Sequence, residues 1–196
     1  MVDDGMSAFS EDLKRWMERE RRPRDGSPST VRLRARDVIV LFWRYSGVWP
    51  TAIFRMSAWC SRHGVRGVPT ILERLNLLLF GIEISSSTRI GPGLYIAHPV
   101  GTVLMAESVG ANASFIAAVT LGMRETHEFP TLADGVMVGA GARVLGGITL
   151  GDGCTIGANA VVIGDVPAGA TAVGVPAKVL SARPKAPDAF AKAFRK

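Results

Sequence analysis

The C-terminal half of this chain repeats a pattern that is six residues long. Written in sixes from Ile84, it runs ISSSTR, IGPGLY, IAHPVG, TVLMAE and, after one extra residue, VGANAS and FIAAVT. After residues 121–131 it resumes as LADGVM, VGAGAR, VLGGIT, LGDGCT, IGANAV and VIGDVP. At about 100° per residue, six residues turn an α-helix through about 600°, so this period cannot keep one helix face apolar. The pattern instead predicts a coil of three short, flat strands per turn, each pointing one aliphatic side chain inward.

The composition agrees with a coil whose interior holds small and aliphatic side chains. Seventeen of the 22 glycines lie in residues 81–180, and all four tryptophans lie in residues 1–76. About twelve units at three per turn predict roughly four turns. Cys154 occupies the fifth position of LGDGCT, where small residues point inward, so we expect a packing thiol there rather than a nucleophile.

The chain before the coil is expected to be helical. Ser10, followed by Glu11 and Asp12, is typical of an N-cap and an acidic first turn, which predicts a helix through about Glu20. Two prolines and a glycine follow it. Apolar residues at helical spacing predict further helix within residues 31–56 and 68–80.

These features divide the chain into three parts: an α-helical region at 1–80 with a partly flexible start at 1–30, the β-coil domain at 81–180, and a basic tail at 181–196. Net charge is +5 over residues 1–76, −3 over 77–179 and +4 over 180–196, which sums to +6. The N-terminal arginines alternate with acidic residues, so no nucleic-acid partner is expected. Apolar runs fall far short of the roughly 20 residues of a membrane span, and no signal peptide is evident, so we expect a cytoplasmic protein without a transmembrane segment.

The repeat, the closing phrase GVPAKVL and the preceding helical segment together resemble the serine acetyltransferase group of hexapeptide-repeat acyltransferases, over roughly residues 35–180. The resemblance implies a left-handed parallel β-helix. It also implies an acetyl-CoA-dependent O-acetyltransferase that forms trimers or multiples of trimers, with sites between subunits. L-serine is the first expected acceptor, as in cysteine biosynthesis. Two alternatives stay open: a sugar hydroxyl in exopolysaccharide biosynthesis, and a catalytically silent scaffold protein.

The resemblance assigns the chemistry first to His98, in IAHPVG. The matching histidine of the family is a general base, and an imidazole can take the proton of a hydroxyl as it attacks a thioester. Glu83 stands where similar enzymes place an aspartate that helps to hold the histidine, so we expect it to orient His98. A second family acid, just before the histidine, is replaced here by Ala97.

An acceptor site is expected at the polar interruption GMRETHEFP, which begins at Gly122. Similar enzymes carry an Arg-His pair before the proline of this loop, whereas this chain has Glu128 and Phe129. Because an acidic side chain repels a carboxylate, we expect Arg124 or His127 to bind the acceptor instead.

The acyl donor, acetyl-CoA, is expected along the groove between neighbouring coils of two subunits. Gly122, Ala140 and Ala158 are spaced by eighteen residues, one predicted turn each, and similar enzymes line the pantetheine arm with such small residues. Lys178 is expected to face the phosphates, with Lys185, Lys192 and Arg195 nearby in the tail. The histidines and cysteines lack paired ligand spacing, so no metal is expected.

Overall fold

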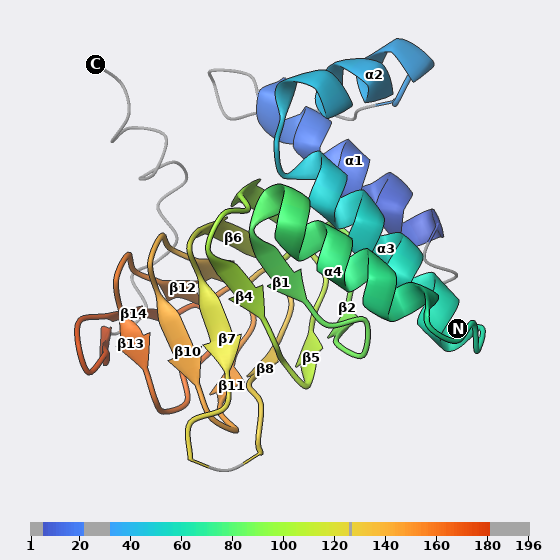
Figure 1. The fold of residues 1–196 in the computed structure, drawn as a ribbon. Helices are drawn as coiled ribbons and strands as arrows, with labels where there is room; N and C mark the ends of the chain where they lie inside the picture. The colour runs from blue at the N-terminus through green and yellow to red at the C-terminus, as the bar shows by residue number, and fades with distance from the viewer. Residues whose placement is uncertain (1–5, 22–31, 126, 181–196) are drawn as a thin grey trace.

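In the described part of the chain, four α-helices lie at one end of a parallel β-coil (Figure 1). The computed structural model describes residues 6–21, 32–125 and 127–180. The predicted tail at 181–196, with Lys185, Lys192 and Arg195, therefore lies outside the described residues. The helices are α1 (Met6–Glu20), α2 (Ala35–Arg44), α3 (Val48–Arg62) and α4 (Val68–Phe80). None of these described helices is long and apolar enough to cross a bilayer.

Two details of the expected helices are wrong. Helix α1 begins at Met6, so Ser10 lies inside it and is not its N-cap. The helical segment expected within residues 31–56 is two helices, because α2 ends at Arg44 and α3 begins at Val48. The break lies at Tyr45, whose backbone is extended. A Cβ at Gly47 would lie 1.8 Å from the carbonyl oxygen of Ile96, so the backbone between the helices rests directly on the coil.

The coil consists of three sheets whose neighbouring strands are parallel, except for the last antiparallel pair. The first sheet contains β1 (Ile82–Ile84), β4 (Thr102–Leu104), β7 (Thr120–Gly122), β10 (Arg143–Leu145) and β13 (Val161–Val162). The second contains β2 (Arg89–Ile90), β5 (Ser108–Val109), β8 (Thr131–Leu132) and β11 (Thr149–Leu150). The third contains β3 (Tyr95–His98), β6 (Ser114–Ala117), β9 (Met137–Val138), β12 (Thr155–Ile156), β14 (Thr171–Val173) and β15 (Lys178–Leu180). The coil makes about five turns, one more than the count of sixes suggests.

Aliphatic side chains form continuous inward ladders, as the six-residue pattern predicts. The ladder of the first sheet runs through Ile84, Leu104, Leu121, Val144 and Val162, all of which are buried. Counting in sixes from Ile84 places position 102 in this ladder, and that register is wrong by two residues. The corner after His98 holds two residues more than a six-residue unit, so Leu104 takes the ladder position opposite Ile84.

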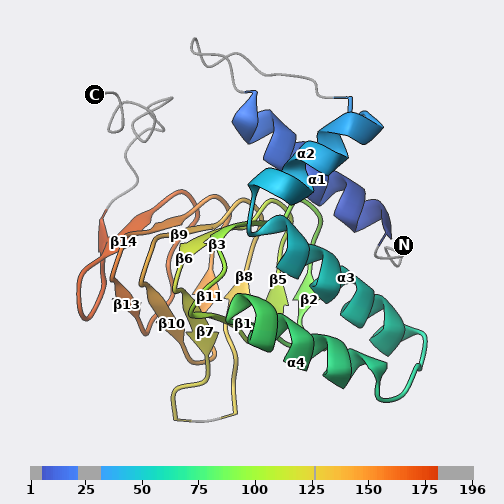
Figure 2. The same cartoon turned by 45° about the horizontal axis from the view of Figure 1, so that its top comes forward.

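The helices close the first turn of the coil. Phe54 and Ala58 of α3 belong to the same buried cluster as the ladder residues. A second cluster joins α1, α2 and the start of α3, and Tyr95 of β3 packs against it. In Figure 2, α1 and α2 cross above the coil while α3 and α4 run side by side along its edge. The helical region is thus packed onto the coil rather than separate from it.

Candidate active site

His98 is an exposed side chain at the end of β3, where the chain turns from the third sheet into the first. Buried Pro99 follows it, and the N–H of Thr102 donates to the Pro99 carbonyl at 3.0 Å to close the turn. The N–H of Gly101 donates to the carbonyl oxygen of Gly81 at 2.8 Å, which stacks the turn on the start of β1. His98 is therefore presented to solvent at a corner that backbone hydrogen bonds hold in place.

The surroundings of this corner are unusually apolar for an exposed site. Val100 is 71% exposed, and a Cβ added at Gly81 would lie 3.6 Å from its side chain. Leu78 and Leu79, in the last turn of α4 just before Gly81, are 80% and 62% exposed. Exposed apolar clusters of this kind are typical of surfaces that contact another chain or a ligand.

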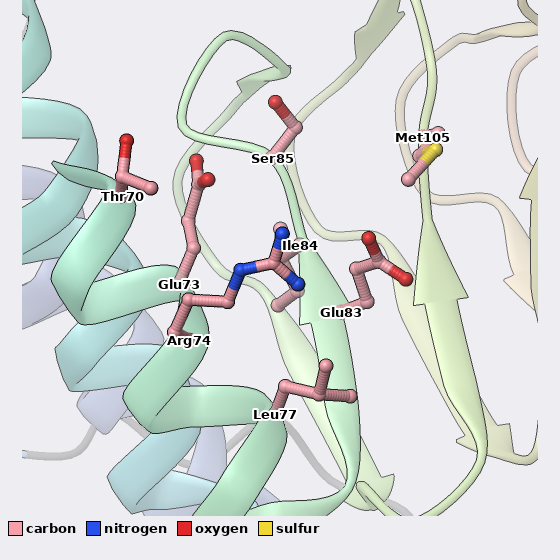
Figure 3. Close-up of a pocket in the computed structure, with 8 residues that line it drawn as sticks. All are labelled: Thr70, Glu73, Arg74, Leu77, Glu83, Ile84, Ser85 and Met105. Carbon is pink, nitrogen blue, oxygen red and sulfur yellow. The ribbon is translucent and has the colours of Figure 1, made fainter.

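Glu83 lies in the middle of β1, between the inward-pointing Ile82 and Ile84, and so faces outward. It lines a hollow of about 210 Å³ between α4 and the first strands of the coil (Figure 3). The lining residues are Thr70, Glu73, Arg74, Leu77, Glu83, Ile84, Ser85 and Met105.

Within this hollow, the Arg74 side chain extends from α4 toward Glu83 (Figure 3). The Glu73 carboxylate accepts a hydrogen bond from the Ser86 N–H at 2.5 Å. Among the described residues, no hydrogen bond or ion pair joins Glu83 to His98 or to Arg74. The geometry of a single chain thus places Glu83 in the α4 hollow without contact to the imidazole, and its orienting role stays a prediction.

The interrupting loop leaves the coil after β7 and returns at β8; it projects beyond the other turns at the bottom of Figure 1. Arg124 and His127 are both exposed, and Arg124 pairs with the neighbouring Glu125 at 3.2 Å. The strands of the first sheet begin beside the His98 corner and end at the edge where the loop leaves. At about 3.3 Å per residue, these edges are about 10 Å apart, and among the described residues no hydrogen bond or ion pair joins Arg124 or His127 to His98.

A second hollow, of about 500 Å³, connects the loop to the α4 hollow. It is lined by Phe129 of the loop, by the Arg89–Glu107 ion pair at 2.8 Å, and by Ser85 and Met105. Since Ser85 and Met105 line both hollows, the two form one outward-facing groove along the first turns of the coil.

The predicted donor-binding residues do not all share one column. Ala140 and Ala158 lie on successive turns of one corner, where the Asn159 N–H donates to the Ala140 carbonyl at 2.8 Å. Gly122 pairs in register with Leu145 instead, at another corner, so the expectation of one column for all three residues is wrong. The interrupting loop adds five residues to that turn and breaks the spacing of eighteen. Lys178 is exposed on β15 at the last turn of the coil.

The six-repeat pattern described as bacterial transferase hexapeptide matches residues 129–164. Serine acetyltransferase of Helicobacter pylori is 38% identical over 143 residues, which cover 70% of this chain and 82% of that protein. The chain belongs to the serine acetyltransferase family. A serine acetyltransferase of Synechococcus elongatus is 37% identical over 150 residues, 74% of this chain and 62% of that protein. The chain thus spans about three fifths of this cyanobacterial relative.

Solved serine acetyltransferases share the fold over nearly the whole chain. The crystal structure from Neisseria gonorrhoeae has a TM-score of 0.79 at 30% identity and covers 93% of this chain and 68% of that one. The same protein in complex with serine has a TM-score of 0.75 at 30% identity, covering 90% and 69%. The helices before the coil are therefore part of the shared architecture.

In the present member of the serine acetyltransferase family, the sequence did not reveal the side chains that anchor α1 to the first turn of the coil. Arg15 of α1 donates to the Gly93 carbonyl at 2.6 Å and to the Ser114 hydroxyl at 2.8 Å. Burial lowers the pKa of Arg15 to about 10. Arg19 lies over the ring of Tyr95 at 3.9 Å. Both arginines lie in a segment where basic and acidic residues alternate. Such a pattern does not tell which side chains are anchored to the coil and which are solvated.

Proposed function

We propose that this chain is an acetyl-CoA-dependent O-acetyltransferase with His98 as its general base and L-serine as its acceptor. The observation that carries the proposal is the exposed imidazole on a rigid coil corner, in a chain that covers most of a serine acetyltransferase. In the proposed step, His98 takes the proton of the acceptor hydroxyl while the hydroxyl oxygen attacks the carbonyl carbon of the thioester. The carbon–sulfur bond then breaks, and the imidazolium returns the proton to the coenzyme A thiolate.

The donor is proposed to lie along the corner that carries Ala140 and Ala158. Their side chains are single methyl groups, which let a ligand approach the backbone closely. Lys178 is exposed at the last turn, where its ammonium is free to meet a phosphate. Glu83 is proposed to stabilise the protonated imidazole once the donor and acceptor are bound.

A trimer is proposed to complete the site. Within one chain the interrupting loop and His98 lie at opposite edges of the first sheet, so a neighbouring copy is proposed to bring Arg124 or His127 to an acceptor at His98. Exposed Val100, Leu78 and Leu79 around the corner supply an apolar surface for that contact. Light scattering coupled to size-exclusion chromatography should give three times the mass of the chain or a multiple of it, and a monomer would contradict this assembly.

The acceptor is tested by following coenzyme A release from acetyl-CoA with L-serine and, in parallel, with nucleotide sugars. The proposal expects release with L-serine. The second candidate acceptor is a sugar hydroxyl. It is favoured by Glu128 and Phe129, because an acid near the loop end repels a carboxylate but not a neutral sugar. Release with the sugars alone would exclude the serine assignment, and release with neither would exclude transfer to both classes of acceptor.

A further inference from the structure

The outward face of α2 exposes large apolar side chains that the rest of the described chain leaves uncovered. Trp43 is 93% exposed, Ile39 is 70% exposed and Val40 is 45% exposed. The opposite face of the same helix buries Asp37 and Leu41. Residues spaced by three and four lie on one side of a helix, so the exposed residues form one continuous stripe, which we call the α2 surface.

The α2 surface lies at the end of the molecule remote from the coil. Figure 1 places α2 beyond α1 and α3, and in Figure 2 α2 crosses α1 on the side away from the coil. Trp49, at the start of α3, is 48% exposed and packs edge-on against Phe42 with ring centroids 4.7 Å apart. A second indole therefore borders the stripe, and neither the His98 corner nor the groove along the coil uses any of these residues.

Arginines surround this apolar stripe. Arg32, Arg34, Arg36 and Arg44 are all exposed, and the Arg36 side chain is 73% exposed. The acid within residues 32–44 is Asp37, which is buried and pairs with Arg21 at 2.7 Å and with Arg36 at 3.8 Å. Arg44 also contacts Glu20 at 2.9 Å. Residues 32–44 thus carry four basic side chains and one acidic one, a net charge of +3.

We propose that the α2 surface binds the surface of an anionic lipid membrane. An interfacial helix buries an apolar face rich in Trp and aliphatic residues at the headgroup boundary and holds Lys or Arg at its margins. Trp43 and Ile39 supply the apolar face, and Arg32 and Arg36 supply the positive margin. Tryptophan is favoured at this depth because its ring is amphipathic.

Charge argues for a lipid surface rather than a second copy of this chain. A face-to-face contact between two copies would bring two sets of arginines together, and like charges repel. An anionic headgroup layer instead attracts each arginine. Helix α2 spans 10 residues, about 15 Å, so it would lie flat in the headgroup layer and leave the coil in water.

The test is co-sedimentation of the full chain with vesicles of phosphatidylglycerol and phosphatidylcholine, against vesicles of phosphatidylcholine alone. We expect binding to the anionic vesicles only, with release in 1 M salt because the Debye length then shrinks to about 3 Å. Ile39→Asp should abolish binding. Val175→Asp is the matched control, since Val175 is 71% exposed at the far end of the coil and the variant adds the same charge.

Replacing both Arg32 and Arg36 by Gln should weaken vesicle binding by about fivefold for each arginine removed. Circular dichroism confirms that each variant is folded. The proposal is overturned if the chain fails to bind anionic vesicles, if it binds neutral vesicles equally well, or if both aspartate variants bind alike. A lower oligomer mass for Ile39→Asp without any lipid effect would instead assign the surface to a second copy. Vesicle binding does not require acetyl transfer, so it is independent of the proposed enzyme activity.

Discussion

Asp12 of α1 and Arg55 of α3 form an almost fully buried ion pair, with Nε of Arg55 2.8 Å from Oδ2 of Asp12. The same guanidinium donates to the carbonyl oxygens of Ile90 and Gly91, each at 2.7 Å. The Asp12 carboxylate also accepts the Leu94 N–H at 2.7 Å. Burial raises the pKa of Asp12 against the opposing effect of Arg55. This network joins two helices to the first turn of the coil.

Arg55→Met should lower the free energy of unfolding by about 3–5 kcal/mol, because it leaves the Asp12 carboxylate buried without its partner. Urea denaturation measures the change. The matched control is Arg89→Met, which breaks the exposed pair with Glu107 and should cost no more than about 1 kcal/mol. Equal losses in the two variants would mean that the buried network does not hold the helices on the coil.

His98→Ala should lower kcat/KM by about 10²–10⁴-fold, the usual contribution of a general base. The side chain is exposed and makes no hydrogen bond within the described chain, so the free energy of unfolding should stay within about 0.5 kcal/mol. His63→Ala is the control, since His63 is exposed at the end of α3, where it stacks on Trp59. Near-normal turnover of the His98 variant would remove this residue from the mechanism.

Arg124→Ala combined with His127→Ala should raise the KM for the acceptor by about tenfold or more, because a hydrogen bond to a charged group contributes about 1.5–3 kcal/mol. Both side chains are exposed, so the melting temperature should not change. The KM for acetyl-CoA in the same assays serves as the control. An unchanged acceptor KM would exclude this loop from acceptor binding.

The coil could be predicted from sequence because each inward position depends on its own six-residue unit. The ladder residues from Leu132 to Val162 keep a spacing of six and are all buried. The predicted register was wrong at Leu104 because the corner after His98 is longer than a six-residue unit allows. The sequence does not reveal the length of a corner, since an aliphatic residue follows it in either case. Gly122 was misplaced for the same reason, since the number of residues in a loop changes the partner across the sheet.

The candidate site was less accessible to sequence reasoning. His98 was singled out because it is the one histidine in the regular repeats, and its catalytic role stays a prediction. The buried role of Asp12 could not, since an acid near Ser10 is equally typical of a helix start. Arg55 did leave a signal, because it is a lone charge in the apolar run TAIFRMSAWC. Its partner lies 43 residues away, and no local pattern connects the two.

Gly47→Ala should destabilise the fold by about 1–3 kcal/mol or more through overpacking. A Cβ at this position would lie 1.8 Å from the Ile96 carbonyl oxygen and 2.9 Å from the Trp16 ring, so the α2–α3 junction would have to lift off the coil. Gly164→Ala is the control, because nothing lies within 4 Å of its Cβ position, and it should change stability by no more than about 0.5 kcal/mol. Thermal melts of the two variants decide the matter.

Cys154 should make the stability of the coil fall at alkaline pH. Its thiol is fully buried in the ladder, and burial raises its pKa from 9.0 to about 11. Between these values the unfolded thiol ionises while the folded one stays protonated, so the unfolded state is favoured as pH rises. The loss approaches about 3 kcal/mol, since each pKa unit corresponds to about 1.4 kcal/mol.

Cys154→Ala isolates this effect, because alanine already fills the equivalent inward positions at Ala142 and Ala160. The stability advantage of the natural chain over the variant should be constant below pH 8 and should shrink between pH 9 and pH 11, as measured by urea denaturation at each pH. A thiol reagent should modify Cys154 only as fast as the chain unfolds. An advantage that stays constant to pH 11 would show that the thiolate is tolerated inside the coil, and that the ladder admits water at this turn.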